Sequence, residues 1–246
     1  MKLKRTYGWY PDIPDQRDYL YSAIRPVVRL PKQVDLRSFC SIIEDQGNLG
    51  SCTAQALAGN LEFLDNKVDS VYTDVSRLFI YYNERVLIDS VDYDSGASLR
   101  DGIKSLKNSG VCEERLWPYD IEKFTKIPPA ECYKDANDHR VKSYYRLESP
   151  REMLTCLTDG YPFVFGFTVY ESFETARVAK TGKVNMPRKG EAALGGHAVM
   201  AVGYDQSDKR FLVRNSWGVG WGMDGYFTMP FRYLETLAED FWTVRK

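Results

Sequence analysis

The chain of 246 residues has only two histidines and no excess of charge of either sign. Its 33 Lys and Arg residues balance 34 Asp and Glu residues, which leaves a formal net charge of −1. Such a small charge gives no reason to expect nucleic acid or a membrane surface as a partner. No stretch approaches the roughly 20 apolar residues of a membrane span. The charged N-terminus is followed by no apolar run of the kind found in signal peptides.

Cysteine is also sparse, and the chain has no internal repeats or low-complexity tracts. The five cysteines are Cys40, Cys52, Cys112, Cys132 and Cys156. An odd number without a dense spacing pattern does not indicate a disulfide framework. No metal site and no cofactor are expected.

One stretch, from Asp45 to Ala56, is the centre around which the rest of the chain is organised. It is followed by apolar residues at spacings of three and four, the period of an amphipathic helix with one buried face. We expect a helix from Cys52 to about Lys67, with Ser51 as its N-cap. Cys52 would then lie in the first turn, where free N–H groups and the helix dipole favour a thiolate.

Two later segments supply the base and the orienting amide that a thiolate nucleophile requires. The first is a glycine turn at Gly195-Gly196 that leads through His197 into an alternating apolar strand. The second is Arg214-Asn215-Ser216-Trp217-Gly218, with Trp221-Gly222 just beyond it. A nucleophile, a base and an amide that orients the base are the three roles of a Cys–His–Asn triad.

The order of these motifs resembles the papain family of cysteine peptidases. The motifs are Gln46, Cys52, His197, Asn215-Ser216-Trp217-Gly218 and Trp221-Gly222, and the resemblance extends from about Leu30 to the C-terminus. It implies an α+β, two-lobe papain-like fold in which a helical lobe packs on a β-barrel-like lobe, with the active-site cleft between them. We expect the helical lobe at about residues 40–138 and the β-rich lobe at about 139–246. A monomer is expected.

The resemblance also assigns roles to individual residues. Cys52 would be the nucleophile, His197 the acid and base, and Asn215 the residue that orients His197. The oxyanion hole would consist of the Cys52 backbone N–H and the Gln46 side chain, and Trp217 and Trp221 would shield the triad. For Trp221, ordinary core packing has equal weight. The implied reaction is hydrolysis of peptide bonds in protein or peptide substrates through an acyl-enzyme thioester, by an endopeptidase.

Two alternatives remain open. The first is a catalytically idle papain-fold module that binds or inhibits other proteins, although such a module would not need Gln46, Cys52, His197 and Asn215 together. The second is exopeptidase action or acyl transfer by the same triad, but no histidine pair indicates the occluding loop of a dipeptidase. The other histidine, His139, lies in a charged connector and is expected to be a solvated loop residue.

The chain departs from the family pattern at several positions. Thr53 replaces the tryptophan that usually follows the nucleophile, and Gly196 replaces the acidic or polar residue that often precedes the histidine. Leu49 stands where family members from oxidising compartments carry a cysteine, and residues 94–97 lack its partner. The missing disulfide favours a reducing compartment such as the cytoplasm.

The resemblance also places a substrate pocket for the second residue on the acyl side. Its border would consist of Ser98, Leu99, Gly166, Gly195, Gly196 and Glu239. Small residues would leave this pocket roomy. Glu239 would attract a basic side chain if it forms the floor, and would otherwise be a solvated charge at a helix end.

Residues 1–29 precede the part of the chain that resembles the family. Proline, aspartate and aromatic residues there favour an extended arm over a helix. The arm is either a structural strap on the surface or a short pro-segment in or near the cleft that inhibits the enzyme intramolecularly. In the second case, deletion of residues 1–29 should raise activity.

The remaining elements follow from periodicity and stop signals. Helices are expected at about 74–86, at 98–108 before Gly110, and from the capping box Ser149-Pro150-Arg151-Glu152 to Gly160. Strands are expected at about 163–169, 197–204, 211–214 and 226–229.

Overall fold

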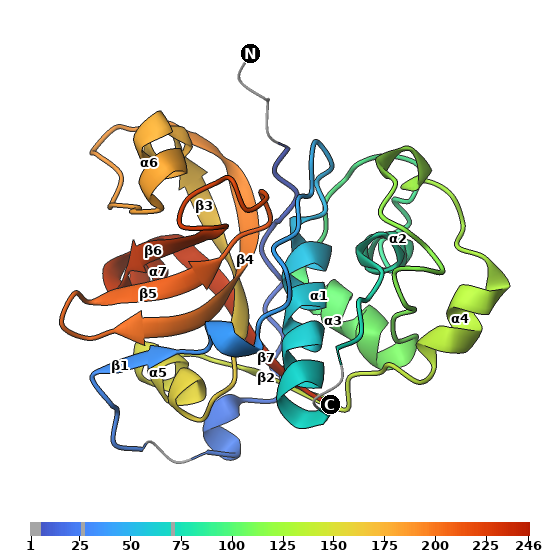
Figure 1. The fold of residues 1–246 in the computed structure, drawn as a ribbon, viewed down its shortest axis with the longest axis horizontal. Coiled ribbons are helices and arrows are strands. Elements are labelled where there is room, and N and C mark those ends of the chain that lie inside the picture. The colour runs from blue at the N-terminus through green and yellow to red at the C-terminus, as the bar shows by residue number, and fades with distance from the viewer. Residues whose placement is uncertain (1–5, 26–27, 70–71) are drawn as a thin grey trace.

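The computed structural model describes residues 6–25, 28–69 and 72–246. The helices between Cys52 and Ala136 gather on one side of the molecule and an antiparallel sheet lies on the other, with the N-terminal arm running between them (Figure 1). The fold is therefore α+β with two lobes and is papain-like, as predicted. The parts of the predicted arm at 1–5 and 26–27 lie outside the described residues.

The helical side is built around α1, which is buried on every face. Its elements are α1 (Cys52–Leu64) with a π-turn (Asp65–Asp69), α2 (Arg77–Val86), α3 (Leu99–Asn108) and α4 (Ala130–Ala136), plus a 3-10 turn at Ile121–Lys123. All residues of α1 are buried. The prediction of a single buried face was wrong because α2 and α3 pack against one side of α1 while β4 packs against another.

Helix starts were predicted correctly at Cys52, at residues 98–99 and at Ser149-Pro150, whereas α2 begins at Arg77 and not at about residue 74, because Ser76 is its N-cap. Ser98 accepts a hydrogen bond from the Asp101 backbone N–H (3.2 Å), and Ser149 accepts one from Glu152 (3.3 Å) at the start of α5 (Pro150–Thr158). Ser51 precedes α1 but makes no side-chain capping bond. Its hydroxyl lies 2.6 Å from the Tyr119 hydroxyl instead, so a tertiary contact replaces the expected local one.

The second lobe is a seven-stranded antiparallel sheet with β4 near its centre. The strands are β1 (Gln33–Asp35), β2 (Ser143–Arg146), β3 (Phe163–Tyr170), β4 (Ala193–Asp205), β5 (Arg210–Arg214), β6 (Tyr226–Pro230) and β7 (Ala238–Arg245). Their order is β2-β7-β3-β4-β5-β6, and β1 pairs with β4. The short helices α6 (Ala176–Thr181) and α7 (Phe231–Leu237) flank the sheet, as do 3-10 turns at Tyr21–Ala23, Arg37–Phe39 and Glu171–Glu174.

The register of the sheet determines where the predicted site residues lie. On β3 and β4, Phe167 is opposite His197 and Thr168 is opposite Gly196. On β3 and β7, Gly166 is opposite Glu239. Residues from three strands are thus brought to one end of the sheet, beside the start of α1.

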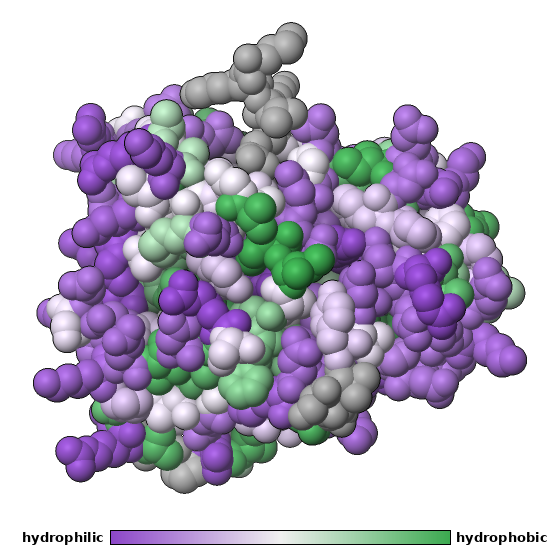
Figure 2. All heavy atoms as spheres, viewed as in Figure 1, coloured by the Kyte–Doolittle hydropathy of each residue, from purple (hydrophilic) through white to green (hydrophobic). Residues whose placement is uncertain are grey.

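The surface is mostly hydrophilic on the face shown in Figure 2, and its hydrophobic side chains form small separate patches. All five cysteines are free thiols. Within the described ranges, no helix has the length and apolar character needed to cross a membrane.

Candidate active site

Cys52 opens α1 at the junction with the sheet and is completely buried. Burial raises the pKa of its thiol to about 11, although backbone N–H groups of Ala198, Gly8 and Thr53 directed at the sulfur lower it in part. Ala198 directly follows His197, so the sulfur lies beside the strand that carries the histidine. With the arm in place the group is a thiol and not the thiolate expected from the helix dipole, because desolvation outweighs these donors.

His197 and Asn215 lie together in the interior. The imidazole Nε2 is 2.9 Å from the Asn215 side-chain oxygen, and both residues are buried. Trp217 stacks on the imidazole with ring centroids 4.9 Å apart at 27°. Trp221 meets Trp217 edge-on at 5.1 Å and also stacks on Phe173. It therefore packs in the core and also supports Trp217, whose ring covers the imidazole.

Gln46 is held in place by the segment that follows Asn215. Its side-chain oxygen accepts a hydrogen bond from the Ser216 hydroxyl (2.7 Å), and its backbone N–H donates to the Ser216 carbonyl (2.9 Å). Its side-chain amide donates to the Leu49 carbonyl at 3.0 Å and approaches the Thr6 carbonyl at 3.5 Å. Ser216 had no assigned role in the sequence analysis, although it lies inside the motif that carries the resemblance.

The loop before Cys52 is anchored by two further residues that the sequence analysis missed. The Gly50 N–H donates to both carboxylate oxygens of Asp94, at 3.1 and 3.0 Å, and the Tyr119 hydroxyl donates to the Gln46 carbonyl at 3.0 Å. Asp94 belongs to the segment in which the cysteine partner of Leu49 is missing. Hydrogen bonds of a carboxylate therefore connect the two segments that a disulfide would have joined.

Residues 6–11 of the arm, here called the plug, lie against these residues. The Trp9 N–H donates to the Gly196 carbonyl (3.1 Å), and the Ala97 N–H donates to the Gly8 carbonyl (2.7 Å). A Cβ atom at Gly8 would lie only 1.7 Å from the Gly50 carbonyl oxygen. The backbone of the plug thus fits between the two lobes at Cys52.

The indole of Trp9 occupies space left by two glycines. A Cβ atom at Gly166 would lie 1.8 Å from the indole, and one at Gly196 would lie 2.6 Å from it. Trp9 is only 8% exposed, and its ring N–H has no hydrogen-bond partner among the described residues. Any larger residue at Gly166 or Gly196 would close this slot.

The other predicted pocket residues are only partly brought together. Gly195, Gly196 and Glu239 line a cavity of about 300 Å³ beside Trp9. Glu239 is exposed. Leu99 is fully buried in the core, and the Ser98 hydroxyl is turned to the Asp101 carboxylate at 2.9 Å.

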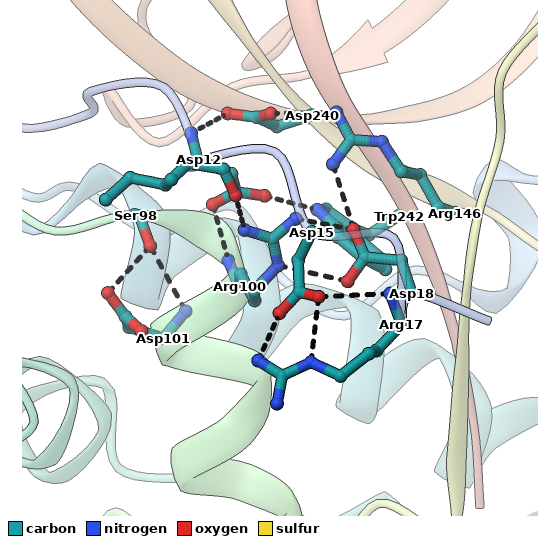
Figure 3. Close-up of polar contacts among 11 residues, drawn as sticks. Asp12, Asp15, Arg17, Asp18, Ser98, Arg100, Asp101, Arg146, Asp240 and Trp242 are labelled. Carbon is teal, nitrogen blue, oxygen red and sulfur yellow. Dashed lines mark hydrogen bonds and ion pairs between the residues drawn. The ribbon is translucent and has the colours of Figure 1, made fainter.

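Residues 12–25, here called the strap, continue the arm and bind through buried side chains (Figure 3). The Asp12 carboxylate accepts hydrogen bonds from the Trp242 indole (2.8 Å) and the Arg100 backbone N–H (3.0 Å), while the Asp12 N–H donates to Asp240 (2.7 Å). Asp18 accepts from the Arg100 guanidinium at 3.2 Å. Since Arg100 lies on α3 whereas Trp242 and Asp240 lie on β7, the strap ties the helices to the sheet.

Further along the strap, the Tyr21 hydroxyl donates to the Asp159 carboxylate at 2.7 Å, and Tyr21 is 1% exposed. In the network around Asp12, burial and then the neighbouring Asp12 charge raise the pKa of Asp240 to about 7.

His139 is partly buried and not fully solvated as expected. One of its ring nitrogens and carboxylate oxygens of Glu113 and Asp135 all lie within 4.8 Å of one another. Asp135 already accepts the Glu113 backbone N–H (3.0 Å), and Glu113 pairs with Arg115. This cluster is therefore explained by internal contacts.

Comparisons with known proteins identify the family of this chain. The model of the papain family of cysteine proteases matches residues 30–235. The uncharacterised peptidase C1-like protein L477 of Acanthamoeba polyphaga mimivirus is 41% identical, with 99% of this chain and 88% of that protein covered. Cysteine proteinase 3 of Entamoeba histolytica is 28% identical over 92% of this chain and 70% of that protein.

Among solved structures, xylellain, a cysteine protease from Xylella fastidiosa, superposes with a TM-score of 0.90 at 41% identity, covering 99% of this chain and 97% of the other. The fold, the grouping of Cys52, His197 and Asn215 at one junction, and these similarities lead to one conclusion. The chain belongs to the papain family of cysteine proteases and is a papain-like cysteine peptidase.

Proposed function

We propose that this peptidase acts as an endopeptidase through a triad of Cys52, His197 and Asn215. The observation that carries the proposal is the 2.9 Å contact between His197 and Asn215. The next residue on the strand, Ala198, directs its backbone N–H at the Cys52 sulfur. An amide oxygen that accepts the ring N–H fixes the tautomer and the orientation of the imidazole.

In the proposed reaction, His197 takes the proton of the Cys52 thiol and the thiolate attacks the carbonyl carbon of the scissile bond. The negative charge that develops on the carbonyl oxygen is met by the Cys52 N–H and the Gln46 side-chain amide. His197 then gives its proton to the departing amine, which leaves a thioester. Water attacks the thioester with His197 as the base and releases the acid and the free thiol.

Trp217 supports this chemistry by covering the imidazole and keeping water from competing for the hydrogen bond to Asn215. Gln46 is already oriented by Ser216, so it would not have to reorganise when the oxyanion forms. Loss of one such donor typically lowers turnover by about 10²–10³. We therefore expect a loss of this size in Gln46→Ala.

Labelling by an epoxide-type thiol inhibitor tests the proposal. The wild type should be labelled at Cys52, and Cys52→Ala should be neither labelled nor active on a fluorogenic peptide. Cys156→Ala is the matched control, since Cys156 is equally buried but lies on α5, and its labelling should equal that of the wild type. An active Cys52→Ala variant would rule out the triad.

A catalytically idle binding module is the alternative, and it predicts no cleavage even when Cys52 is labelled. The mode of cleavage is tested on a folded protein substrate. Internal fragments support an endopeptidase, whereas stepwise loss of terminal residues would indicate an exopeptidase.

We also propose that the plug inhibits the enzyme intramolecularly. The plug directs the N–H of Gly8 at the sulfur, and an N–H group is a hydrogen-bond donor that a thiolate cannot attack. Trp9 at the same time fills the slot over Gly166 and Gly196. The arm therefore covers Cys52 and fills the slot beside it.

The slot that Trp9 occupies also indicates which substrate side chains the enzyme should prefer. A bulky aromatic side chain fits where Trp9 lies, and an exposed carboxylate at Glu239 beside it would attract a basic side chain. Glu239→Ala should lower the relative rate on Arg-containing dipeptide substrates compared with Leu-containing ones. An unchanged ratio would remove Glu239 from the substrate pocket.

A further inference from the structure

A buried carboxyl group with few hydrogen-bond partners lies behind the nucleophile, Cys52. Glu84 on α2 is 0% exposed, and its Oε1 atom accepts a hydrogen bond from the Thr53 hydroxyl at 2.6 Å. Its Oε2 atom has no hydrogen-bond partner among the described residues. Helix α3 closes the other side so tightly that a Cβ atom at Gly102 would lie 2.8 Å from this oxygen.

The charged and titratable groups around Glu84 do not neutralise it. Arg85 is adjacent in sequence, but its guanidinium donates to the backbone carbonyls of Tyr81, Val91 and Tyr93 at 3.0 Å. The other groups that face Glu84 are Asp101 on α3, Tyr10 of the plug and Cys52 on α1. None of these three is a cation, and burial raises the pKa of Glu84 to about 8.

Thr53 connects this carboxyl group to the nucleophile. Its backbone N–H is directed at the Cys52 sulfur, while its hydroxyl donates to Glu84. A tryptophan, the usual residue of the family at this position, has no hydroxyl that could make this contact. Thr53 therefore departs from the family pattern at a position where a buried acid, Glu84, accepts the hydrogen bond of its hydroxyl.

We propose that Thr53 and Glu84 form an electrostatic control on the nucleophile, in which Glu84 is a positioning residue that must stay uncharged for Cys52 to ionise easily. This inference rests on the proposed role of Cys52. Once Glu84 loses its proton, its negative charge lies behind the sulfur, is offset only in part by Arg85, and opposes thiolate formation. The reactivity of Cys52 should then rise less steeply with pH than that of a thiol without this neighbour.

The test is the rate at which iodoacetamide labels Cys52 in the full chain between pH 6 and 9.5, quantified on the Cys52 peptide by mass spectrometry. The ratio of Glu84→Gln to wild type should be close to 1 at pH 6, where Glu84 is uncharged in both. At pH 9 it should reach about threefold or more, because only the wild type then carries the charge.

Glu62→Gln is the matched control, because Glu62 is also a fully buried carboxyl on the helical side but pairs with Ser41. Its ratio to wild type should stay near 1 at every pH. Thr53→Val removes the hydrogen bond that favours the charged form of Glu84, so Glu84 should ionise at a higher pH. Labelling of Thr53→Val should therefore exceed that of the wild type near pH 8, where more of the wild type carries the charge. Thr53→Val decides the question if Glu84→Gln fails to fold.

A Glu84→Gln ratio that is constant with pH, or equal pH profiles for Glu84→Gln and Glu62→Gln, would overturn the inference while Cys52 remains the nucleophile. Absence of labelling at Cys52 in every variant and at every pH would instead overturn the proposed function.

Discussion

The plug and the strap are consecutive parts of one arm, but they bind by different kinds of contact. The plug is held by backbone hydrogen bonds, such as those of Gly8 and Trp9, and by two aromatic side chains. The Trp9 indole fills its slot, while the Tyr7 ring contacts His197 and Trp217 and the Tyr7 hydroxyl donates to Glu174. The strap is held by buried side chains, with Asp12 bonded to both lobes and Tyr21 enclosed. Backbone contacts can be made by many peptides, whereas the strap contacts require these side chains. We therefore propose that substrate can replace the plug, whereas the strap belongs to the fold.

The largest effect should come from removing both parts. Deletion of residues 1–29 leaves Arg100 without Asp18 and opens the sites of Asp12 and Tyr21. Because a buried pair that loses one partner costs about 3–5 kcal/mol, Tm should fall by roughly 10 °C or more. Thermal unfolding followed by tryptophan fluorescence measures this.

Deletion of residues 1–10 is the matched comparison, since it keeps the strap. It should lower Tm much less and raise the activity on a fluorogenic peptide. The distinction between plug and strap would be lost if the two deletions had the same Tm.

Trp9→Ala should act on the plug alone. Truncation of a buried tryptophan typically costs about 3–5 kcal/mol. Here much of this free energy is lost from the binding of the plug in the cleft. Activity on a fluorogenic peptide should therefore rise by about tenfold or more. Tyr19→Ala truncates an aromatic residue of the strap that is 62% exposed, and its activity should match the wild type. An inactive, stable Trp9→Ala variant would mean that Trp9 does not close the cleft.

Asp12→Asn should act on the strap. An asparagine can replace only part of the carboxylate, and the buried Trp242 N–H or the Arg100 N–H loses its acceptor. The expected cost is about 1–3 kcal/mol, or roughly 2–12 °C in Tm.

Asp15→Asn is the control for this variant, because Asp15 pairs locally with an exposed Arg17. An exposed pair contributes about 1 kcal/mol or less, so Tm should hardly move. Equal shifts for the two variants would contradict the importance of the buried network.

The buried carboxyl groups between the strap and β7 should also make the stability depend on pH. The pKa of Asp240 is raised from an ordinary 3.8 to about 7, chiefly by burial and then by the Asp12 charge. Between these values the folded chain keeps a proton that the unfolded chain loses. The stability contributed by Asp240 is therefore present below about pH 4 and is lost as pH rises toward 7. In Asp240→Asn, Tm should decrease less over this range, and parallel Tm–pH curves would exclude Asp240 as the cause.

Much of the fold was accessible from the sequence because it depends on local patterns. Periodicity located α1, α2, α3 and β3, and Ser98 and Ser149 marked helix starts. The segments around Cys52, His197 and Asn215 were recognised from their motifs.

What could not be predicted depends on contacts between distant residues. No local pattern indicates that Asp12 bonds to Asp240, that Asp94 holds Gly50, or that Glu84 lies behind Thr53. For the same reason, the sequence presented strap and pro-segment as alternatives for the whole arm, whereas the contacts in the structure support our proposal of one role for each part.

The covalent link between the plug and the strap has a consequence for the proposed inhibition of the peptidase. A blocking segment that stays covalently attached to the enzyme is not lost when substrate displaces it. Once substrate leaves, the same segment can return, since Asp12 keeps it tethered nearby at high local concentration. Such a peptidase could be switched on and off repeatedly by competition alone, without irreversible maturation.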